Sequence, residues 1–298
     1  MAVHTVGIMS PGDMGAAVGR ALRDNGLDVV TCLEGRSERT RSLAVDAGIR
    51  DVPDMESLVN EADLVLSILV PSEALPLAER VAAALKSTGA DTAFADCNAV
   101  SPDTAIAIGD VISDAGGRYI DAGIIGSPPG RGAPPRFYAS GQHEDVLAEL
   151  NGKGIDVRVM GGAPGRASGI KMCYAALTKG TNALYAATLT AAESLGLSDE
   201  LFAERESSQQ AMLKSMQGVV SLPGKAFRWV GEMEEIAATF ESAGVTPKIH
   251  LGAADTFRMV AESPLGDERP ETVDKSRTLR DTVRIFVESN RAESSAAD

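Results

Sequence analysis

Residues 5–15 read TVGIMSPGDMG, a short apolar run followed by a turn that contains two glycines. Gly12 and Gly15 take the last two glycine positions of the G-x-G-x-x-G motif, and Ser10 stands where its first glycine would be. The glycines of this motif let the backbone approach a pyrophosphate, and the helix that follows offers its N-terminus to the anion. An ordinary strand-turn-helix without a ligand is the alternative. The predicted cofactor contacts are Ser10, Pro11, Gly12, Asp13, Met14 and Gly15.

The first half of the chain alternates apolar strands with helices. Further strands are expected at 27–33, 50–52, 63–70 and 92–97. Helices are expected between them, from Ser37 to Ala47 and, with a gap at Pro76, from Ser72 to Ser87. Strand-helix alternation with short turns is typical of a parallel, doubly wound sheet, which binds its ligand at the carboxyl ends of the strands. The sequence places there Ser10, Arg36, Val70, Pro71 and Asn98.

The loop after the second strand is expected to decide which dinucleotide binds. Glu34 suits the ribose diol of NAD. The 2′-phosphate of NADP is expected to draw charge-assisted hydrogen bonds from Arg36, Ser37, Arg39 and Arg41. Because four such groups outweigh one carboxylate, we predict NADP as the cofactor, bound by Arg36 and Ser37, with NAD as the alternative. A solvated helix start with a basic face is the other interpretation of this loop.

Beyond the predicted sheet the pattern changes. Residues 117–162 hold short strands and glycine-proline turns, and no strand pattern recurs after them. Ala167 to Leu195 is alanine-rich with apolar residues on nearly every face, which predicts a buried helix joining two domains. We expect an α/β dinucleotide-binding domain at 1–162 and an all-helical domain at 163–298. The further helices are expected at 199–217, 224–243, 247–262 and 270–290, with 291–298 frayed.

The composition excludes several classes of protein. A net charge of -14 and a pI near 4.7 repel nucleic acid and anionic membranes, so small molecules are the expected partners. No apolar run reaches the roughly 18 residues of a membrane span. The three cysteines lie far apart without C-x-x-C spacing, which predicts neither a metal site nor a disulfide framework and fits a cytoplasmic protein.

Lys171 stands out on the predicted central helix. A lysine in so apolar a setting loses hydration, which lowers its pKa towards the range where it gives and takes protons. The alternative is a lysine whose ammonium group reaches water at a helix end. Ahead of it, the proline-rich loop from Gly126 to Gly132 is stiff enough to form the wall of a substrate pocket.

Four segments, in order and spacing, resemble the motifs of the β-hydroxyacid dehydrogenases, which include 3-hydroxyisobutyrate and 6-phosphogluconate dehydrogenases. The four segments are GIMSPGDMG (7–15), DCNAVSP (96–102), DAGIIGS (121–127) and GRASGIKMCYA (165–175). The second half, with KMCYAALTKGTNAL and RWVGEMEEIAATF, resembles a phosphogluconate dehydrogenase-like branch with a C-terminal domain of unknown function. The resemblance extends over essentially the whole chain.

This resemblance implies a Rossmann domain followed by a helical domain through which a homodimer forms. It also implies a dinucleotide in the cleft, Asn98 near the nicotinamide and Lys171 as general acid/base. The chain departs from the family at Ile125, where the family has serine, and at Tyr174 and Ala175, where it has paired asparagines. The substrate contacts that the sequence then offers are Gly126, Ser127, Tyr174 and Thr178.

Three functions remain open at this point. The first is an NADP-dependent oxidoreductase that acts on an alcohol or carbonyl with Lys171 as proton donor. The second is an imine reductase, which shares the dinucleotide domain, although the retention of Lys171 favours the first. The third is a dinucleotide-binding regulator without turnover, which the missing serine and asparagines favour.

Overall fold

The computed structural model describes residues 2–269 and 272–297. Its contacts divide the chain into two compact units, with the division between Met172 and Cys173. The predicted boundary at residue 162 comes before this division, because the first turns of α7 (Arg166–Ser194) are hydrogen-bonded to the first unit. Among the described residues, no helix combines the length and the apolar character that crossing a membrane requires.

The first unit is built on an eight-stranded sheet in the order β3-β2-β1-β4-β5-β6-β7-β8. All neighbouring strands are parallel except β6 and β7. Because β1 pairs with both β2 and β4, the strand order reverses there, which confirms the doubly wound Rossmann sheet predicted from the sequence. The strands are β1 (Thr5–Met9), β2 (Asp28–Cys32), β3 (Arg50–Val52), β4 (Leu64–Ser67), β5 (Ala93–Asp96), β6 (Arg118–Ile125), β7 (Arg136–Ser140) and β8 (Asp156–Val159).

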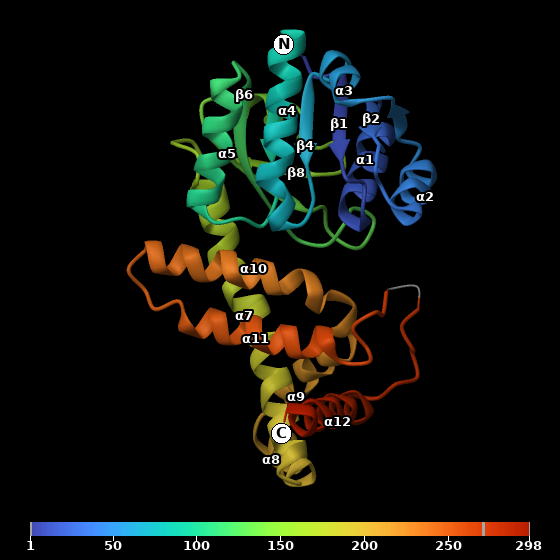
Figure 1. The fold of residues 1–298 in the computed structure, drawn as a ribbon, viewed down its shortest axis with the longest axis vertical. Coiled ribbons are helices and arrows are strands. Elements are labelled where there is room, and N and C mark those ends of the chain that lie inside the picture. The colour runs from blue at the N-terminus through green and yellow to red at the C-terminus, as the bar shows by residue number, and fades with distance from the viewer. Residues whose placement is uncertain (1, 270–271, 298) are drawn as a thin grey trace. The chain divides into compact units, whose positions relative to one another are not determined.

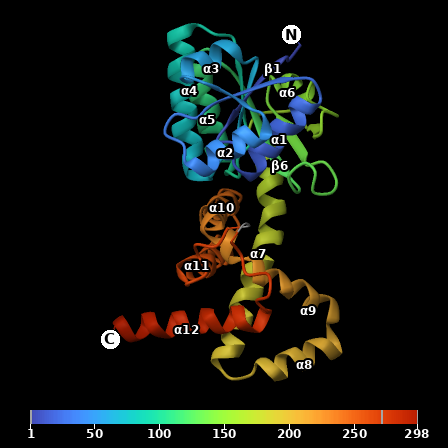
Figure 2. The ribbon, with the colours of Figure 1, turned by 90° about the vertical axis from the view of Figure 1, so that its right-hand side faces the viewer.

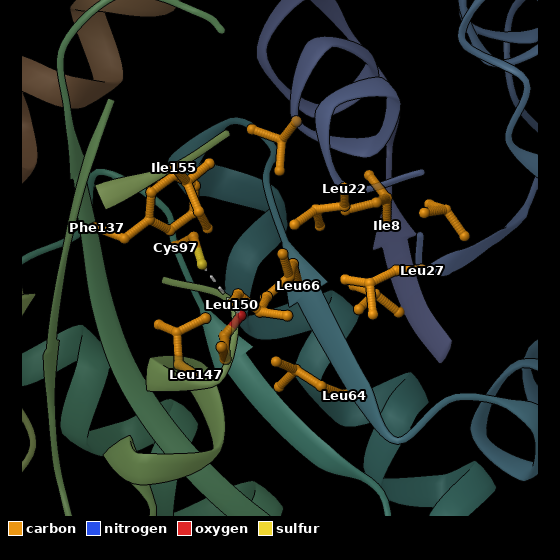
Figure 3. Close-up of a cluster of buried hydrophobic side chains, with 14 of the residues drawn as sticks. Ile8, Leu22, Leu27, Leu64, Leu66, Cys97, Phe137, Leu147, Leu150 and Ile155 are labelled. Carbon is orange, nitrogen blue, oxygen red and sulfur yellow. Dashed lines mark hydrogen bonds between the residues drawn. The ribbon is translucent and has the colours of Figure 1, made fainter. Parts of the chain in front are cut away.

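Helices cover both faces of the sheet, each over its own apolar core. One core holds side chains of α1 (Asp13–Asp24), α2 (Glu38–Ala47) and α6 (Glu144–Ala148). The other holds side chains of α3 (Met55–Glu61), α4 (Ala74–Thr88) and α5 (Pro102–Asp114), and Figure 1 shows α4 and α5 in front of the sheet. In the first core, Leu22 of α1 lies beside Ile8 of β1 (Figure 3). This packing holds the strand ends in register.

The gap predicted at Pro76 is absent. A 3-10 turn, η1 (Pro71–Glu73), leads directly into α4, so Pro76 falls in the first turn of that helix. Proline is tolerated there because the N–H groups of the first turn have no intrahelical acceptor.

The second unit is all-helical, as predicted. After α7 come α8 (Ser198–Ser208), α9 (Gln210–Met216), η2 (Gln217–Ser221), α10 (Pro223–Ser242), α11 (Lys248–Glu262) and α12 (Leu279–Ala297). Helices α10 and α11 lie side by side, whereas α8 and α9 lie on the opposite side of α7 (Figure 1, Figure 2).

Several helix predictions in this unit were wrong. The single helix expected at 199–217 breaks at Gln209, whose backbone leaves the helical region. The helix expected at 270–290 begins at Leu279 and continues to Ala297, so 291–297 are not frayed; positions 270, 271 and 298 lie outside the described residues. Helix α7 is not buried on every side, since Leu177 and Leu184 are 76% and 65% exposed. These two leucines of α7 are therefore exposed on the surface of the second unit.

Candidate functional site

The turn after β1 keeps the backbone shape of the glycine motif although its first position is a serine. Ser10 has φ of 59°, and it is the one non-glycine residue in the described chain with a positive φ. Such a conformation costs of the order of 1–3 kcal/mol for a residue with a side chain, and it occurs mainly at ligand-binding sites. The Ser10 carbonyl accepts a hydrogen bond of 2.6 Å from the Gly12 N–H, which closes the turn.

The two glycines of the turn have different surroundings. A Cβ atom added at Gly15 would lie 3.2 Å from the Ser10 carbonyl oxygen and 3.3 Å from Ile8, so Gly15 serves the packing of α1 on β1. At Gly12 the nearest atom would be 3.9 Å away, and no side chain caps the first N–H groups of α1. The open side of Gly12 and the uncapped helix start fit a pyrophosphate. Pro11, Asp13 and Met14 complete this turn.

The basic loop after β2 is mostly occupied with local structure. Ser37 caps α2, Arg39 forms an ion pair of 2.7 Å with Asp13, and Arg41 donates a hydrogen bond of 2.6 Å to the carbonyl of Leu33. Three of the four groups expected to hold a 2′-phosphate are therefore already engaged. Among the described residues, no carboxylate forms an ion pair with the fourth, Arg36.

A second arginine, which the sequence did not single out, lies near Arg36. Both line a cavity of about 250 Å³ together with Met9 at the end of β1 and Cys32 at the end of β2. Burial lowers the pKa of Arg36 from its ordinary value, and the charge of Arg80 lowers it further. Arg80 lies on α4, and only the packing of that helix brings it to this loop. Glu34 lines the same cavity, which therefore offers two guanidinium groups to a phosphate and one carboxylate to a ribose diol.

Asn98 fixes the ends of two central strands. Its side chain is 2% exposed; its Oδ1 accepts a hydrogen bond of 2.6 Å from the Leu69 N–H, and its Nδ2 donates one of 2.7 Å to Ser67 Oγ. The chain then passes through Val70 and Pro71 into η1. These residues lie at the same sheet edge as the turn after β1, because β1, β4 and β5 are parallel neighbours. The predicted contacts of all three with the cofactor stay predictions.

Asp121 on β6, to which the sequence analysis gave no role, holds the start of α7. Its buried carboxylate accepts hydrogen bonds from the N–H groups of Gly165 at 2.7 Å, Ala167 at 3.0 Å and Ser168 at 3.2 Å. The Ser168 hydroxyl adds one of 2.6 Å. A carboxylate at a helix N-terminus also gains from the helix dipole. The signal in the sequence was an aspartate within an apolar strand, where a charge requires several donors.

Lys171 lies in the second turn of α7 and is held against the end of strand β6. Its Nζ donates a hydrogen bond to the carbonyl of Ile124, near the carboxyl end of β6. The helix approaches β6 closely at Gly123, where an added Cβ would lie 2.8 Å from the Ala167 oxygen and 2.9 Å from Lys171 Cβ. The DAGIIGS and GRASGIK segments therefore form one structural unit that fixes Lys171 at the edge where the strands end.

The predicted substrate contacts are divided between the two units. Gly126, with φ of 128°, and Ser127 follow β6 and are exposed. Ile125, at the position of the family serine, is buried and 3% exposed, so it packs into the core. Tyr174 and Thr178 belong to the second unit; Tyr174 is 46% exposed, and the Thr178 hydroxyl lies 3.3 Å from a carbonyl oxygen of its own helix. Their roles stay predictions.

Asp96 is a buried acid with an unusual pKa. Burial raises the pKa of Asp96 to about 7; the hydrogen bond from Asn98 opposes this rise, and the charge of Asp121 adds to it. Its Oδ2 has no hydrogen-bond partner among the described residues. The folded protein therefore keeps this proton up to about neutral pH.

We expect Asp96 to make the protein less stable as the pH rises. An unfolded aspartate releases its proton near pH 4 and the folded one near pH 7, so the folded state binds the extra proton between these values. The free energy of unfolding should therefore fall from pH 4 to pH 7, and less so in Asp96→Asn, whose amide stays neutral. Urea unfolding at pH 5, 6, 7 and 8 measures this slope, and equal slopes in both proteins would contradict the assignment.

Two family models match the chain. The NAD binding domain of 6-phosphogluconate dehydrogenase matches residues 5–151, and a domain of unknown function, DUF1932, matches residues 192–260. An uncharacterized 28.5 kDa protein of Methanothermus fervidus is 29% identical over 196 residues, which are 66% of this chain and 74% of that protein. The first family model covers most of the sheet, and the second lies in the helical unit.

Solved structures share the fold. A conserved protein of unknown function, described as structurally similar to 3-hydroxyacid dehydrogenases, is 30% identical with a TM-score of 0.63, over 86% of this chain and 97% of its own. The 3-hydroxyisobutyrate dehydrogenase of Mycobacterium tuberculosis is 18% identical with a TM-score of 0.67, over 95% of this chain and 99% of its own. Two imine reductases, one with NAD+, and a protein with NADP+ are 17–21% identical. The fold is therefore that of the hydroxyacid dehydrogenases.

Proposed function

Because the chain belongs to the 6-phosphogluconate dehydrogenase-like family that joins this NAD-binding domain to DUF1932, we propose that it is an NADP-dependent oxidoreductase acting on an alcohol or a carbonyl compound. The observation that carries the proposal is the fixed position of Lys171 near the end of β6. The phosphate-binding turn follows β1 at the same edge of the sheet. A dinucleotide site and a proton donor thus belong to one rigid framework.

The division of labour follows from these positions. The dinucleotide, when bound, supplies or accepts the hydride. Lys171 gives a proton to the substrate oxygen during reduction and takes it back during oxidation, as general acid/base. The hydrogen bond to the Ile124 carbonyl orients the Lys171 ammonium group. The Asp121 carboxylate holds the N-terminal end of α7 against β6. Gly126, Ser127, Tyr174 and Thr178 are the proposed substrate contacts.

We expect NADPH to bind at least tenfold more tightly than NADH, which corresponds to about 1.4 kcal/mol. The reason is that Arg36 lacks an ion-pair partner in the described chain and lies near Arg80, so a 2′-phosphate relieves the repulsion between them. Titration calorimetry measures both dissociation constants. Arg36→Ala should weaken NADPH binding and leave NADH binding nearly unchanged. Equal constants for the two cofactors in the wild-type protein would contradict NADP specificity.

The oxidoreductase assignment is tested by steady-state oxidation of NADPH with a panel of aldehydes, keto acids and imines. Turnover of aldehydes or keto acids supports the proposal. Turnover of imines alone would favour the second candidate, which rests on the shared fold of the imine reductases. Cofactor binding without any turnover would favour a regulatory protein instead.

For the assembly we propose a homodimer formed through the helical unit. On α7 and α11, Leu177, Leu184 and Ile249 are 76%, 65% and 70% exposed and line a cavity of about 650 Å³. So much exposed apolar surface on one face is typical of a protein contact. The net charge of -14 supports small molecules, rather than nucleic acid or membranes, as the other partners.

A further inference from the structure

The first turns of α10 and the loop after α11 carry cations that lie against aromatic rings. The guanidinium groups of Arg228 and Arg269 lie 5.8 Å and 5.1 Å from the centre of the Phe227 ring. The ammonium group of Lys225 lies 5.9 Å from the centre of the Trp229 ring. We call Lys225, Arg228 and Arg269 the cation cluster. An aromatic face attracts a cation electrostatically, but most N–H groups of that cation stay available for hydrogen bonds to another group.

The cation cluster has no ion-pair partner within the described part of the chain, although the protein holds 42 acidic and only 28 basic residues. Two carboxylates near the cluster in the described chain are already engaged. Glu232, four residues after Arg228, is paired with the buried Lys179, and Glu268, next to Arg269, is paired with Arg277. These two acidic side chains lie near the cation cluster but pair with other cations, so they do not neutralise it.

Arg269, the member of the cluster that lies outside α10, is held in place by its loop. The loop after α11 packs on the start of α10, where an added Cβ at Gly224 would lie 3.3 Å from the Glu268 carbonyl oxygen. The Arg269 N–H donates a hydrogen bond of 2.8 Å to Thr272 Oγ1, and one guanidinium N–H donates one of 2.8 Å to the Glu268 carbonyl. The Glu268–Arg277 ion pair, in which both side chains are mostly shielded from solvent, anchors the loop. Arg269 is therefore held against Phe227.

Like charges close together at half-buried positions cost free energy unless an anion lies between them. Burial lowers the pKa of Lys225, and the charge of Arg228 lowers it further, so the two side chains repel each other. The Lys225 Nζ has one hydrogen bond, of 3.2 Å, to Ser221 Oγ, which leaves two N–H donors for another ligand. Guanidinium and ammonium groups together are the usual ligands of phosphate and carboxylate groups.

We propose that Lys225, Arg228 and Arg269 form a second binding site of this protein, in the helical unit, for a small oxyanion that carries a phosphate or carboxylate group. Two members of the site lie within the DUF1932 segment, to which the inference thus gives a ligand class. The proposal stands on the second unit alone and does not depend on the dinucleotide or on Lys171.

The single tryptophan of the chain reports on this site, because the Trp229 ring lies next to Lys225. Sodium phosphate and sodium succinate are titrated separately into the full-length protein, with sodium chloride at matched ionic strength as the blank. We expect a saturable change in tryptophan fluorescence with at least one of the two anions, and calorimetry measures the same binding independently. Whichever anion saturates identifies the group that the site accepts. No saturable binding of either anion by both methods would overturn the proposal.

Variants distinguish anion binding at this site from non-specific electrostatic attraction and from binding at the turn after β1. In the double variant Lys225→Met and Arg269→Met, the dissociation constant should rise at least tenfold. The matched control is Arg258→Met, which removes a cation of α11 that is already paired with Glu234 and Asp255, and it should bind as the wild type does. Gly12→Val should also keep the fluorescence change. An unchanged constant in the folded double variant, or loss of the signal in Gly12→Val, would show that the anion binds elsewhere.

Discussion

Replacing Lys171 with alanine should lower kcat by about 100- to 10,000-fold, the usual contribution of general acid-base catalysis. NADPH affinity should stay the same, because the turn after β1 and the Arg36 cavity do not involve this side chain. The fold should also hold, since α7 remains attached to β6 through Asp121. Single-turnover and steady-state kinetics, together with calorimetric titration of NADPH, measure the two effects separately.

Lys179 is the matched control on the same helix. It lies two turns further along α7, and its buried ammonium group pairs with Glu232 and lies 5.7 Å from the centre of the Trp229 ring. Lys179→Ala leaves the half-buried Glu232 carboxylate without its ion-pair partner; the cost in stability should be below the ~3–5 kcal/mol that is typical of a fully buried pair. The expected loss is therefore in unfolding free energy and not in chemistry. A well-folded Lys179→Ala protein without activity, beside an active Lys171→Ala protein, would place the proton donor in the second unit.

The pH-rate profile adds an independent measurement of the same assignment. The basic limb of the wild-type profile should disappear in Lys171→Ala, because the group that titrates there is gone. A limb that survives unchanged would assign the proton transfer to another group, and Tyr174 is the candidate three residues further along α7.

The second large effect is expected at Gly12, where valine should abolish NADPH binding without lowering the thermal midpoint. The φ of Gly12 is -79°, a value that any residue adopts, and an added Cβ would meet no protein atom closer than 3.9 Å. The new side chain therefore fits the protein but fills the space that the pyrophosphate requires. Calorimetry and thermal unfolding together measure the two outcomes.

Gly15→Val is the contrasting variant in the same turn. Its Cβ would lie 3.2 Å from the Ser10 carbonyl and 3.3 Å from Ile8, so overpacking should cost about 1–3 kcal/mol of stability. Binding then weakens because the turn itself is displaced. If Gly12→Val binds NADPH as tightly as the wild type, the turn after β1 is not the cofactor site. A lowered midpoint in that variant would instead show that Gly12 serves packing.

The sequence by itself determined the doubly wound sheet, the helical second unit and the turn after β1. These features depend on short-range patterns: apolar runs with caps and turns between them, and glycines at fixed spacing. Ser10 takes the first glycine position of the motif, and its left-handed backbone is a finding of the structure. The same reasoning failed at Gln209 and at residues 272–278, which were expected within helices and which the structure leaves outside them.

Only the tertiary structure decided what the charged residues do. Arg36, Arg39 and Arg41 lie within six residues of one another, and the sequence predicted the same role for all three. In the structure Arg39 pairs with Asp13, Arg41 donates to a carbonyl, and Arg36 lies near Arg80. Asp121 and the start of α7 are more than forty residues apart in the sequence and meet through four hydrogen bonds. The physical reason is that a charge interacts with whatever lies within a few ångströms of it. Local sequence patterns specify backbone conformation, whereas packing between distant segments sets which partners a charge meets.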